Sequence, residues 1–235
     1  MKRGIFIFLL ITSVTTFSFG FSLSARGAME YFVSAPEPHT HYFEVAIHLK
    51  NYHGEFVDFK LPVWTPGSYL VREYAKNVEG FAAYSSHNKP LNFHKVNKNT
   101  WRVEKEHEKE VIINYRVYSF EGNVRMSYLD ENHAFIMANT LLMYVDDLMG
   151  SSSILHLTFN DSWTSVSTSL SKIGNSGNSF YVPNYDILVD SPIEIGTQTQ
   201  ATNLAESYLQ QGTLTAGTLA IMFRVGDKNI FYAKP

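Results

Sequence analysis

Apolar and polar residues alternate along much of the chain. In the segment HYFEVAIHLKNY, one side carries the apolar residues Phe43, Val45, Ile47 and Leu49. Strict alternation is typical of a β-strand with one buried face. A second strand follows in EFVDFKLPVW, after the turn candidate KNYHG, so we predict that the two strands pair as a hairpin.

The same pattern recurs further along the chain. TWRVEKEHEKEVIINYRVYSF predicts two strands around a charged turn. Further strand candidates are NKPLNFHKV, HAFIMA, SILHLTFN, SVSTSL, NSFYVPN and LAIMFRVGDKNIFYAK, the last with a turn at residues 226–229. Helical periodicity is scarce, with TNLAESYLQQG and TLLMYVDDLMG as the two candidates. The sequence therefore predicts an all-β fold, a mostly antiparallel β-sandwich or curved open sheet with one or two short helices.

The composition agrees with a β-rich globular chain and argues against nucleic acid as a partner. Of 235 residues, 45% are hydrophobic, 14% aromatic and 17% charged, and the charged fraction is low for a soluble protein. The formal net charge is −3, so the chain has no basic footprint for nucleic acid. It has no cysteine, which excludes both disulfide bonds and a cysteine nucleophile.

Residues 1–28 have the order of a secretory signal peptide. A basic start is followed by the apolar run GIFIFLLITSVTTFSFGFSLSA and by small residues in ARGA. A membrane anchor is the alternative, because the run approaches the ~20 residues that span a bilayer. Serine and threonine dilute the run, so we predict cleavage, export to the periplasm or the outside, and no stable membrane span afterwards.

No motif for catalysis or for a bound metal or cofactor is evident. H-E-x-x-H is absent, since HEKEV begins at His107 but has Val111 where the second zinc ligand would stand. There is no G-x-S-x-G elbow and no phosphate-binding glycine loop. His39 and His41 have the spacing of one strand face and could offer two metal ligands, or simply mark the entrance to a strand. We therefore predict no catalytic residue, no metal site and no cofactor.

The densest stretch of unusual residues is LPVWTPGSYLVREYAKNV. Pro62 and Pro66 remove ladder hydrogen bonds, so the preceding strand should stop there. Thr65–Ser68 has Pro and Gly at its central positions, which favours a type II turn.

Four residues around this turn carry distinctive side chains. Trp64 and Tyr69 flank the turn and are interpreted as aromatic clamps. Arg72 and Glu73 then follow in a short irregular or helical turn. The stretch is either a structural corner or part of a binding site.

Five motifs in order carry a family resemblance: LPVWTPGSYLVREYAKNVEGF, KNTWRV, YRVYSF, RMSYLDENHAF and NYDILVDSPIEIG. They resemble the N-terminal β-domain of the glycyl aminopeptidase family of gluzincin metallopeptidases, from Glu30 to Gly196. We therefore divide the chain into a signal peptide, a β-domain at 29–196 and a divergent tail or hairpin at 197–235.

The resemblance implies a role beside a zinc site rather than in it. Family members carry a zinc domain with H-E-x-x-H after the β-domain, and this sequence has no such motif. The implied function is a non-catalytic domain, truncated or stand-alone, that forms at most part of a peptide-substrate cleft. Its partner would be a separately encoded zinc peptidase domain or a peptide. The alternative is a periplasmic peptide- or carbohydrate-binding module using exposed aromatic residues: Trp64, Tyr69, Trp101 and Tyr128.

A β-domain of this kind can supply a carboxylate for the α-ammonium group of a peptide. The predicted substrate-binding residues are Tyr69, Arg72, Glu73, Asp190 and Glu194. The competing interpretations are structural ion pairs and helix capping by Asp190–Ser191 before Pro192.

Arg125 and Asp130, in RMSYLDENHAF, have two interpretations as well. They form an ion pair across a turn within the domain, or they contact substrate.

Overall fold

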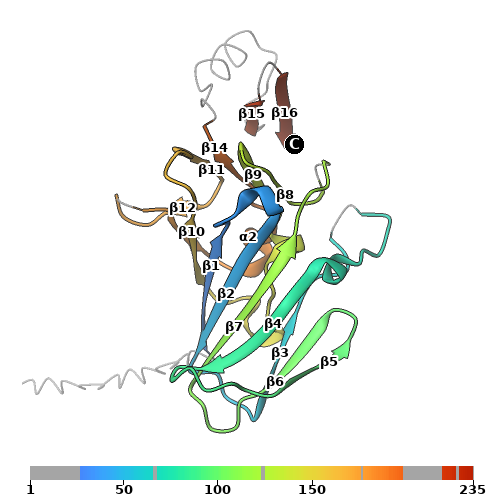
Figure 1. The fold of residues 1–235 in the computed structure, drawn as a ribbon, viewed down its shortest axis with the longest axis vertical. Coiled ribbons are helices and arrows are strands. Elements are labelled where there is room, and N and C mark those ends of the chain that lie inside the picture. The colour runs from blue at the N-terminus through green and yellow to red at the C-terminus, as the bar shows by residue number, and fades with distance from the viewer. Residues whose placement is uncertain are drawn as a thin grey trace, which may run out of the picture.

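The computed structural model describes residues 27–65, 68–122, 125–175 and 177–197, together with the backbone of 219–225 and 228–234. Strands dominate these residues and helices are short, so the prediction of an all-β fold with few short helices is confirmed. Figure 1 shows open sheets rather than a closed barrel. No helix among the described residues has the length and apolar character needed to cross a membrane.

The largest sheet has seven strands in the order β12-β13-β10-β1-β2-β7-β4. Neighbours are antiparallel except for the parallel pair β1 and β10. The strands are β1 (Ala28–Ser34), β2 (Tyr42–Lys50), β4 (Val78–Ser85), β7 (Glu110–Tyr118), β10 (Ser153–Thr158), β12 (Ser171–Lys172) and β13 (Ser179–Val182).

Three smaller sheets complete the described strands. One has the order β3-β6-β5, from Phe56–Lys60, Thr100–Glu104 and Phe93–Asn97. Another has the order β11-β14-β9-β8, from Ser165–Ser167, Ile193–Gly196, His133–Ile136 and Tyr128–Leu129. The third pairs β15 (Leu219–Val225) with β16 (Lys228–Lys234), as the alternation in this segment predicts.

The helical elements are all short. They are η1 (Pro38–Thr40), η2 (Tyr74–Asn77), α1 (Ala138–Leu141), η3 (Asp146–Leu148) and α2 (Tyr185–Val189). The prediction that TLLMYVDDLMG forms one helix is wrong. Tyr144, which lies between α1 and η3, forms a β-bridge with Lys60. The candidate helix TNLAESYLQQG lies outside the described residues.

The predicted pairing of the first two strands is wrong. β2 does not form a hairpin with β3: it lies between β1 and β7, while β3 pairs with β6. The charged turn after β6 likewise leads into a different sheet, since β6 pairs with β3 and β5. In both cases the chain crosses to the facing sheet, which lets both sheets bury their apolar faces in one core.

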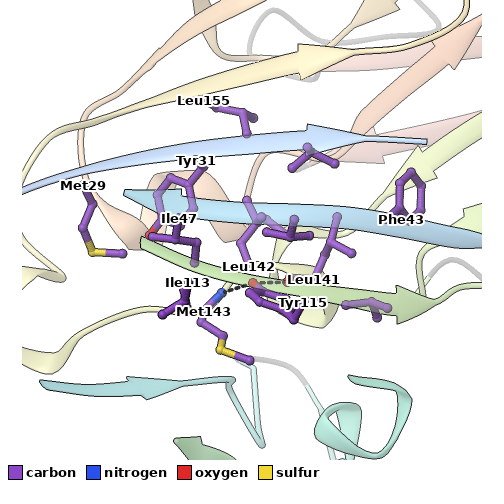
Figure 2. Packing of buried hydrophobic residues seen from close by; sticks show 14 of the residues in the cluster. Met29, Tyr31, Phe43, Ile47, Ile113, Tyr115, Leu141, Leu142, Met143 and Leu155 are labelled. Carbon is purple, nitrogen blue, oxygen red and sulfur yellow. Dashed lines mark hydrogen bonds between the residues drawn. The ribbon is translucent and has the colours of Figure 1, made fainter. Parts of the chain in front are cut away.

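The inner faces of the large sheet and of the three-stranded sheet share this core. Phe81 of β4 stacks on Trp101 of β6, with ring centroids 5.5 Å apart. Leu141, Leu142 and Met143 fill the layer beneath β1, β2 and β7 (Figure 2). Residues 138–145 therefore form a buried plug rather than part of a surface helix.

A buried tyrosine ties this plug to the large sheet. The Tyr115 hydroxyl donates to the carbonyl of Leu141 at 2.8 Å and accepts from the N–H of Met143 at 3.2 Å (Figure 2). Tyr115 is 3% exposed, so neither backbone group has ready access to water. Burial also raises the pKa of Tyr115 well above its ordinary value, which keeps the hydroxyl neutral.

Tyr115→Phe is expected to lower the free energy of unfolding by about 1–3 kcal/mol, because two buried backbone groups lose their partner. Urea denaturation measures the change. Tyr118→Phe on the same strand is the control, since Tyr118 is 39% exposed. Equal losses for the two variants would contradict this account of the plug.

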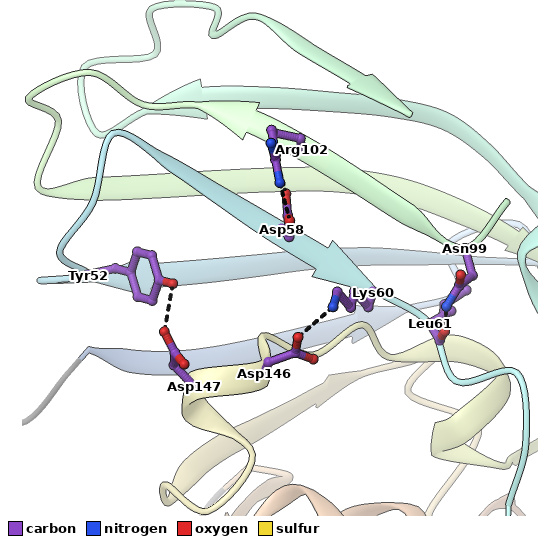
Figure 3. Close-up of polar contacts among 8 residues, drawn as sticks. All are labelled: Tyr52, Asp58, Lys60, Leu61, Asn99, Arg102, Asp146 and Asp147. Atoms are coloured by element: carbon purple, nitrogen blue, oxygen red, sulfur yellow. Dashed lines mark hydrogen bonds and ion pairs between the residues drawn. The ribbon is translucent and has the colours of Figure 1, made fainter. Parts of the chain in front are cut away.

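Polar contacts fix β3 to the plug and to its neighbour β6. Lys60 and Tyr144 exchange backbone hydrogen bonds of 2.9 and 2.8 Å. The Lys60 ammonium group also pairs with Asp146, and Arg102 binds Asp58 through two hydrogen bonds of 2.7 Å (Figure 3). The end of β3, where the unusual stretch begins, is thus held from two sides.

Candidate functional site

The unusual stretch forms a loop whose base is fixed by hydrogen bonds. β3 ends at Lys60, as predicted from Pro62. The Asn99 side chain donates to the Leu61 carbonyl at 2.6 Å (Figure 3), and the N–H of Arg72 donates to the carbonyl of Val63 at 2.6 Å. These contacts close the loop at both of its ends.

The predicted turn at Thr65–Ser68 is present. The N–H of Ser68 donates to the Thr65 carbonyl at 3.1 Å, which is the closing bond of a four-residue turn. The type II assignment depends on residues 66 and 67, which lie outside the described residues. The helical turn expected near Glu73 is η2, which begins one residue later.

The aromatic residues of this loop face solvent. Trp64 is 51% exposed, and its indole N–H donates to the Ser68 carbonyl at 2.7 Å, so it folds over the turn. Tyr69 is 99% exposed, so its interpretation as a clamp is wrong. Leu70 and Val71 are 61% and 66% exposed. The loop therefore presents apolar side chains outward instead of packing them on its own core.

A basic pocket lies beside this loop. Its volume is about 240 Å³, and four cationic side chains and one carboxylate line it: Arg72, Lys76, Lys95, Lys98 and Glu73. Glu73 pairs with Lys98 at 3.4 Å, and the Lys95 ammonium group stands 4.2 Å from the centre of the Trp101 ring. An anionic group is therefore the ligand that this pocket fits best.

Beneath the loop, η2 contacts α1. Tyr74 is buried, and its hydroxyl is hydrogen-bonded by Asn139 and Thr65. Burial raises the pKa of Tyr74, with the nearby Arg72 charge and these hydrogen bonds partly opposing the shift. The Asn139 side-chain oxygen is buried and accepts no hydrogen bond from any described residue. Such buried acceptors are uncommon in folded proteins.

The other two predicted substrate-binding residues lie elsewhere, around α2 and β14. Asp190 is exposed and forms the C-terminal cap of α2, its N–H donating to the Asp186 carbonyl at 3.1 Å. The predicted capping of a helix N-terminus by Asp190–Ser191 is wrong, because β14 follows. The N-cap of α2 is Asn184, whose side chain accepts from the N–H of Ile187 at 2.9 Å.

Glu194 is the buried member of an acid–histidine cluster with the partly buried His133 and Asp130. Its carboxyl oxygen is 3.6 Å from His133 Nε2, and His133 Nδ1 is 3.5 Å from Asp130. Glu194 is 6% exposed, and burial raises its pKa to about 8. Glu194 is therefore mostly a neutral acid at pH 7.

Asp130 behaves in the opposite way from Glu194. Burial alone would raise its pKa, but N–H groups of His133 and Asn132 and the Tyr128 hydroxyl outweigh this and lower it. These partners are local to the turn between β8 and β9. Their presence supports a structural role for Asp130.

Aromatic rings extend this cluster toward the start of β2. Tyr128 stacks on Phe120, which stacks on His41 with centroids 3.7 Å apart. His41 Nδ1 also lies 2.7 Å from the Leu129 carbonyl oxygen. His39 and His41 do not share a strand face, since His39 lies within η1 and His41 follows it in a left-handed conformation. No group of three or more His, Asp or Glu side chains within the described residues is placed to hold a metal ion.

The predicted site residues thus fall into two groups. Tyr69, Arg72 and Glu73 share the loop after β3, whereas Asp190 and Glu194 belong to the α2–β14 region. The four aromatics of the alternative binding module do not form one platform either. Trp101 is 4% exposed within the core, and Tyr128 is half-buried in the ring stack.

Comparison with known protein families identifies the family of this domain. The model of the Peptidase M61 N-terminal domain matches residues 30–197, which is most of the described fold. The chain belongs to the Peptidase M61 N-terminal domain family. The match confirms the resemblance inferred from the five motifs and covers almost the same residues.

Some solved structures are similar to this M61 N-terminal domain. An aminopeptidase N family protein from Idiomarina loihiensis is 29% identical, with a TM-score of 0.68, over 73% of this chain and 30% of that chain. A leukotriene A4 hydrolase from Saccharomyces cerevisiae is 12% identical, with a TM-score of 0.43, over 74% and 29%. The chain thus covers about a third or less of the length of each of these two proteins. No curated protein was found to match it in sequence.

Proposed function

We propose that this M61 N-terminal domain is non-catalytic by itself and forms part of the wall of a peptide-substrate cleft. The observation that supports this is the family match over residues 30–197. A zinc peptidase needs a metal-activated water and a general base. The 235 residues contain no H-E-x-x-H motif. In this proposal a zinc-bearing catalytic domain, encoded separately or elsewhere in a longer protein, supplies that chemistry.

Exposure separates the residues that can contact a peptide from those that cannot do so easily. Arg72 is half-exposed, and Glu73 and Asp190 are exposed, so a peptide can reach their charged groups. Glu194 is buried and mostly neutral at pH 7, which weakens it as an anchor for an ammonium group. Glu73 and Asp190 are therefore the stronger of the predicted carboxylates.

The purified chain is expected to hold no stoichiometric zinc and to cleave neither glycyl nor alanyl amides. Metal analysis and a chromogenic amide assay, with and without a chelator, measure both properties. The Idiomarina loihiensis relative, assayed in parallel, controls for assay conditions. Chelator-sensitive cleavage by the chain alone would overturn the non-catalytic role.

A further inference from the structure

A hollow lies on the outer face of the large sheet, where β10, β1, β2, β7 and β4 run side by side (Figure 1). Its volume is about 630 Å³. The residues that face it alternate along their strands with the buried residues Val33, Val45 and Tyr115, so it opens away from the core. A hollow of this size matches a small-molecule ligand, whose sites span about 300–1,000 Å³.

The strand register places four polar residues in one row across this face. Thr158 of β10 stands beside Ser34 of β1, and Ser34 stands beside Glu44 of β2. Glu44 in turn stands beside Arg116 of β7. Directly paired residues on one face lie within about 5 Å of each other at Cβ, so their side chains reach a common ligand. Asn114, two residues before Arg116, adds an amide group in the next row.

Small residues give the hollow its depth. Ala46 of β2 stands beside Phe32 of β1 in this next row, and its single methyl group leaves room above the sheet. On the β4 side the strand bulges at Gly80, which has a φ of 62°. A Cβ added at Gly80 would meet no atom within 4 Å, so the bulge leaves this side of the hollow open.

The polar side chains of the hollow are mostly unpaired. Arg116 is the exception, because its guanidinium group pairs with Glu79 at 2.9 Å and its guanidinium carbon lies 4.5 Å from the centre of the Tyr42 ring. Four other lining side chains form no hydrogen bond or ion pair with any residue that the structure describes: Ser34, Glu44, Asn114 and Thr158. The hollow therefore offers a free carboxylate and three neutral hydrogen-bonding groups, while its cationic lining residue is already neutralised.

This set of groups fits a primary ammonium group. An ammonium group has three N–H donors, no acceptor and one positive charge. Glu44 supplies the countercharge, and a hydrogen bond to an ionised group is roughly twice as strong as a neutral one. The hydroxyl oxygens of Ser34 and Thr158 and the side-chain oxygen of Asn114 are acceptors for the remaining donors. An anion fits poorly, because Glu44 repels it and Arg116 is engaged.

We infer that this hollow binds the primary ammonium group of a small aliphatic amine, with Glu44 as its counter-ion and an alkyl stem resting on Phe32 and Ala46. A lysine of a polypeptide carries the same group, but it also loses backbone and side-chain freedom on binding. The charged rim offers it no further partner, since Glu79 and Arg116 pair with each other. The inference does not depend on the proposed function, because the hollow contains none of the carboxylates predicted to anchor a peptide: Glu73, Asp190 and Glu194.

Amide NMR titration of the full chain tests the inference with three ligands that share one alkyl stem. Butylamine is expected to bind with a Kd in the low millimolar range and to shift the amide signals of residues 32–34, 44–46 and 114–116. Butyltrimethylammonium keeps the charge but has no N–H donor, and butanol has no charge, so both should bind at least tenfold more weakly. Phosphate is the buffer, because amine buffers would compete.

The same titrations define what would overturn the inference. A Kd for butanol less than tenfold above that of butylamine would assign the hollow to neutral hydroxyl compounds. The same result for butyltrimethylammonium would reduce the interaction to an unspecific effect of charge. Absence of butylamine shifts at the hollow would mean that it is not an amine site. An Ala-Lys-Ala peptide with blocked ends should bind more weakly than butylamine, and equal or tighter binding would assign the hollow to a polypeptide instead.

Variants locate the ammonium group within the hollow. Glu44→Gln removes the charge and keeps the shape, so it should raise the Kd for butylamine at least tenfold. Glu30→Gln is the matched control and should leave the Kd unchanged, because Glu30 lies on the same face of β1, pairs with Lys50 at 3.2 Å and does not line the hollow. Ala46→Leu fills the floor without changing any charge and should abolish binding, with circular dichroism confirming the fold. Equal Kd values for Glu44→Gln and Glu30→Gln, or unchanged binding by Ala46→Leu, would place the amine elsewhere and overturn the inference.

Discussion

Replacing Phe59 with alanine is expected to lower the free energy of unfolding by about 3–5 kcal/mol. Phe59 lies on β3 and is fully buried in the core shared by the three-stranded sheet and the large sheet. Truncation removes a large apolar side chain and leaves a cavity that the rigid sheets cannot fill by collapse. Urea denaturation followed by circular dichroism gives the change. Phe59→Leu leaves a smaller cavity and should fall between the wild type and Phe59→Ala.

The matched control is Phe56→Ala, three residues earlier on the same strand. Phe56 is 44% exposed, and its ring lies 3.8 Å from the Arg102 guanidinium carbon. Losing this cation–π contact should cost about 1 kcal/mol or less. Similar losses at Phe56 and Phe59 would mean that β3 does not hold the two sheets together.

Local patterning predicted most strands of this fold but could not predict their partners. Alternation correctly predicts which face of β2 is buried. It also correctly predicts that the segments of β7, β15 and β16 are strands. β1 was missed although Met29, Tyr31 and Val33 alternate in the same way, because its start overlaps the segment assigned to the signal peptide. Strand β4 was missed because Gly80 and a register shift interrupt its pattern.

Strand pairing depends on contacts between segments far apart in the sequence. The predicted β2–β3 hairpin satisfied every local rule, yet β2 pairs with β1 and β7. In this arrangement the large sheet and the facing sheet each bury an apolar face. The residues that bury these faces are far apart in the sequence, so a short stretch of sequence cannot predict the pairing. The turn at Thr65–Ser68 was predicted better than the strand pairing, as the hydrogen bond from the Ser68 N–H to the Thr65 carbonyl shows.

The candidate site was predicted by residue type and not by environment. The sequence marks Glu194 and Glu73 equally as carboxylates, but the fold buries the first and exposes the second. The basic pocket was missed because Lys95 and Lys98 come from β5 and the turn after it, far along the chain from Arg72. Composition alone could not reveal this local excess of cations in a chain with a net negative charge.

Glu194 is expected to make the protein less stable as the pH rises from about 4.5 to about 8. Burial raises the folded-state pKa from its ordinary value of 4.5 to about 8, so the folded protein retains a proton that the unfolded chain releases. Between these values each pH unit costs at most about 1.4 kcal/mol, and the whole window at most about 4–5 kcal/mol. The stability is fully present below the lower value and is lost as the pH passes through the upper one.

Glu194→Gln removes this proton without changing the shape of the side chain. The wild type should lose at least about 2 kcal/mol more than Glu194→Gln between pH 5 and pH 8, measured by urea denaturation at fixed ionic strength. His133 Nε2 lies 3.6 Å from the Glu194 carboxyl oxygen, and this histidine remains unchanged in each variant. Asp130 contacts the same histidine and remains unchanged in each variant. Glu131→Gln, at an exposed position in the adjoining turn, should follow the wild type.

Parallel pH profiles for the wild type and Glu194→Gln would show that the buried carboxyl group ionises normally. Glu194 would then again be a candidate anchor for a peptide ammonium group at neutral pH.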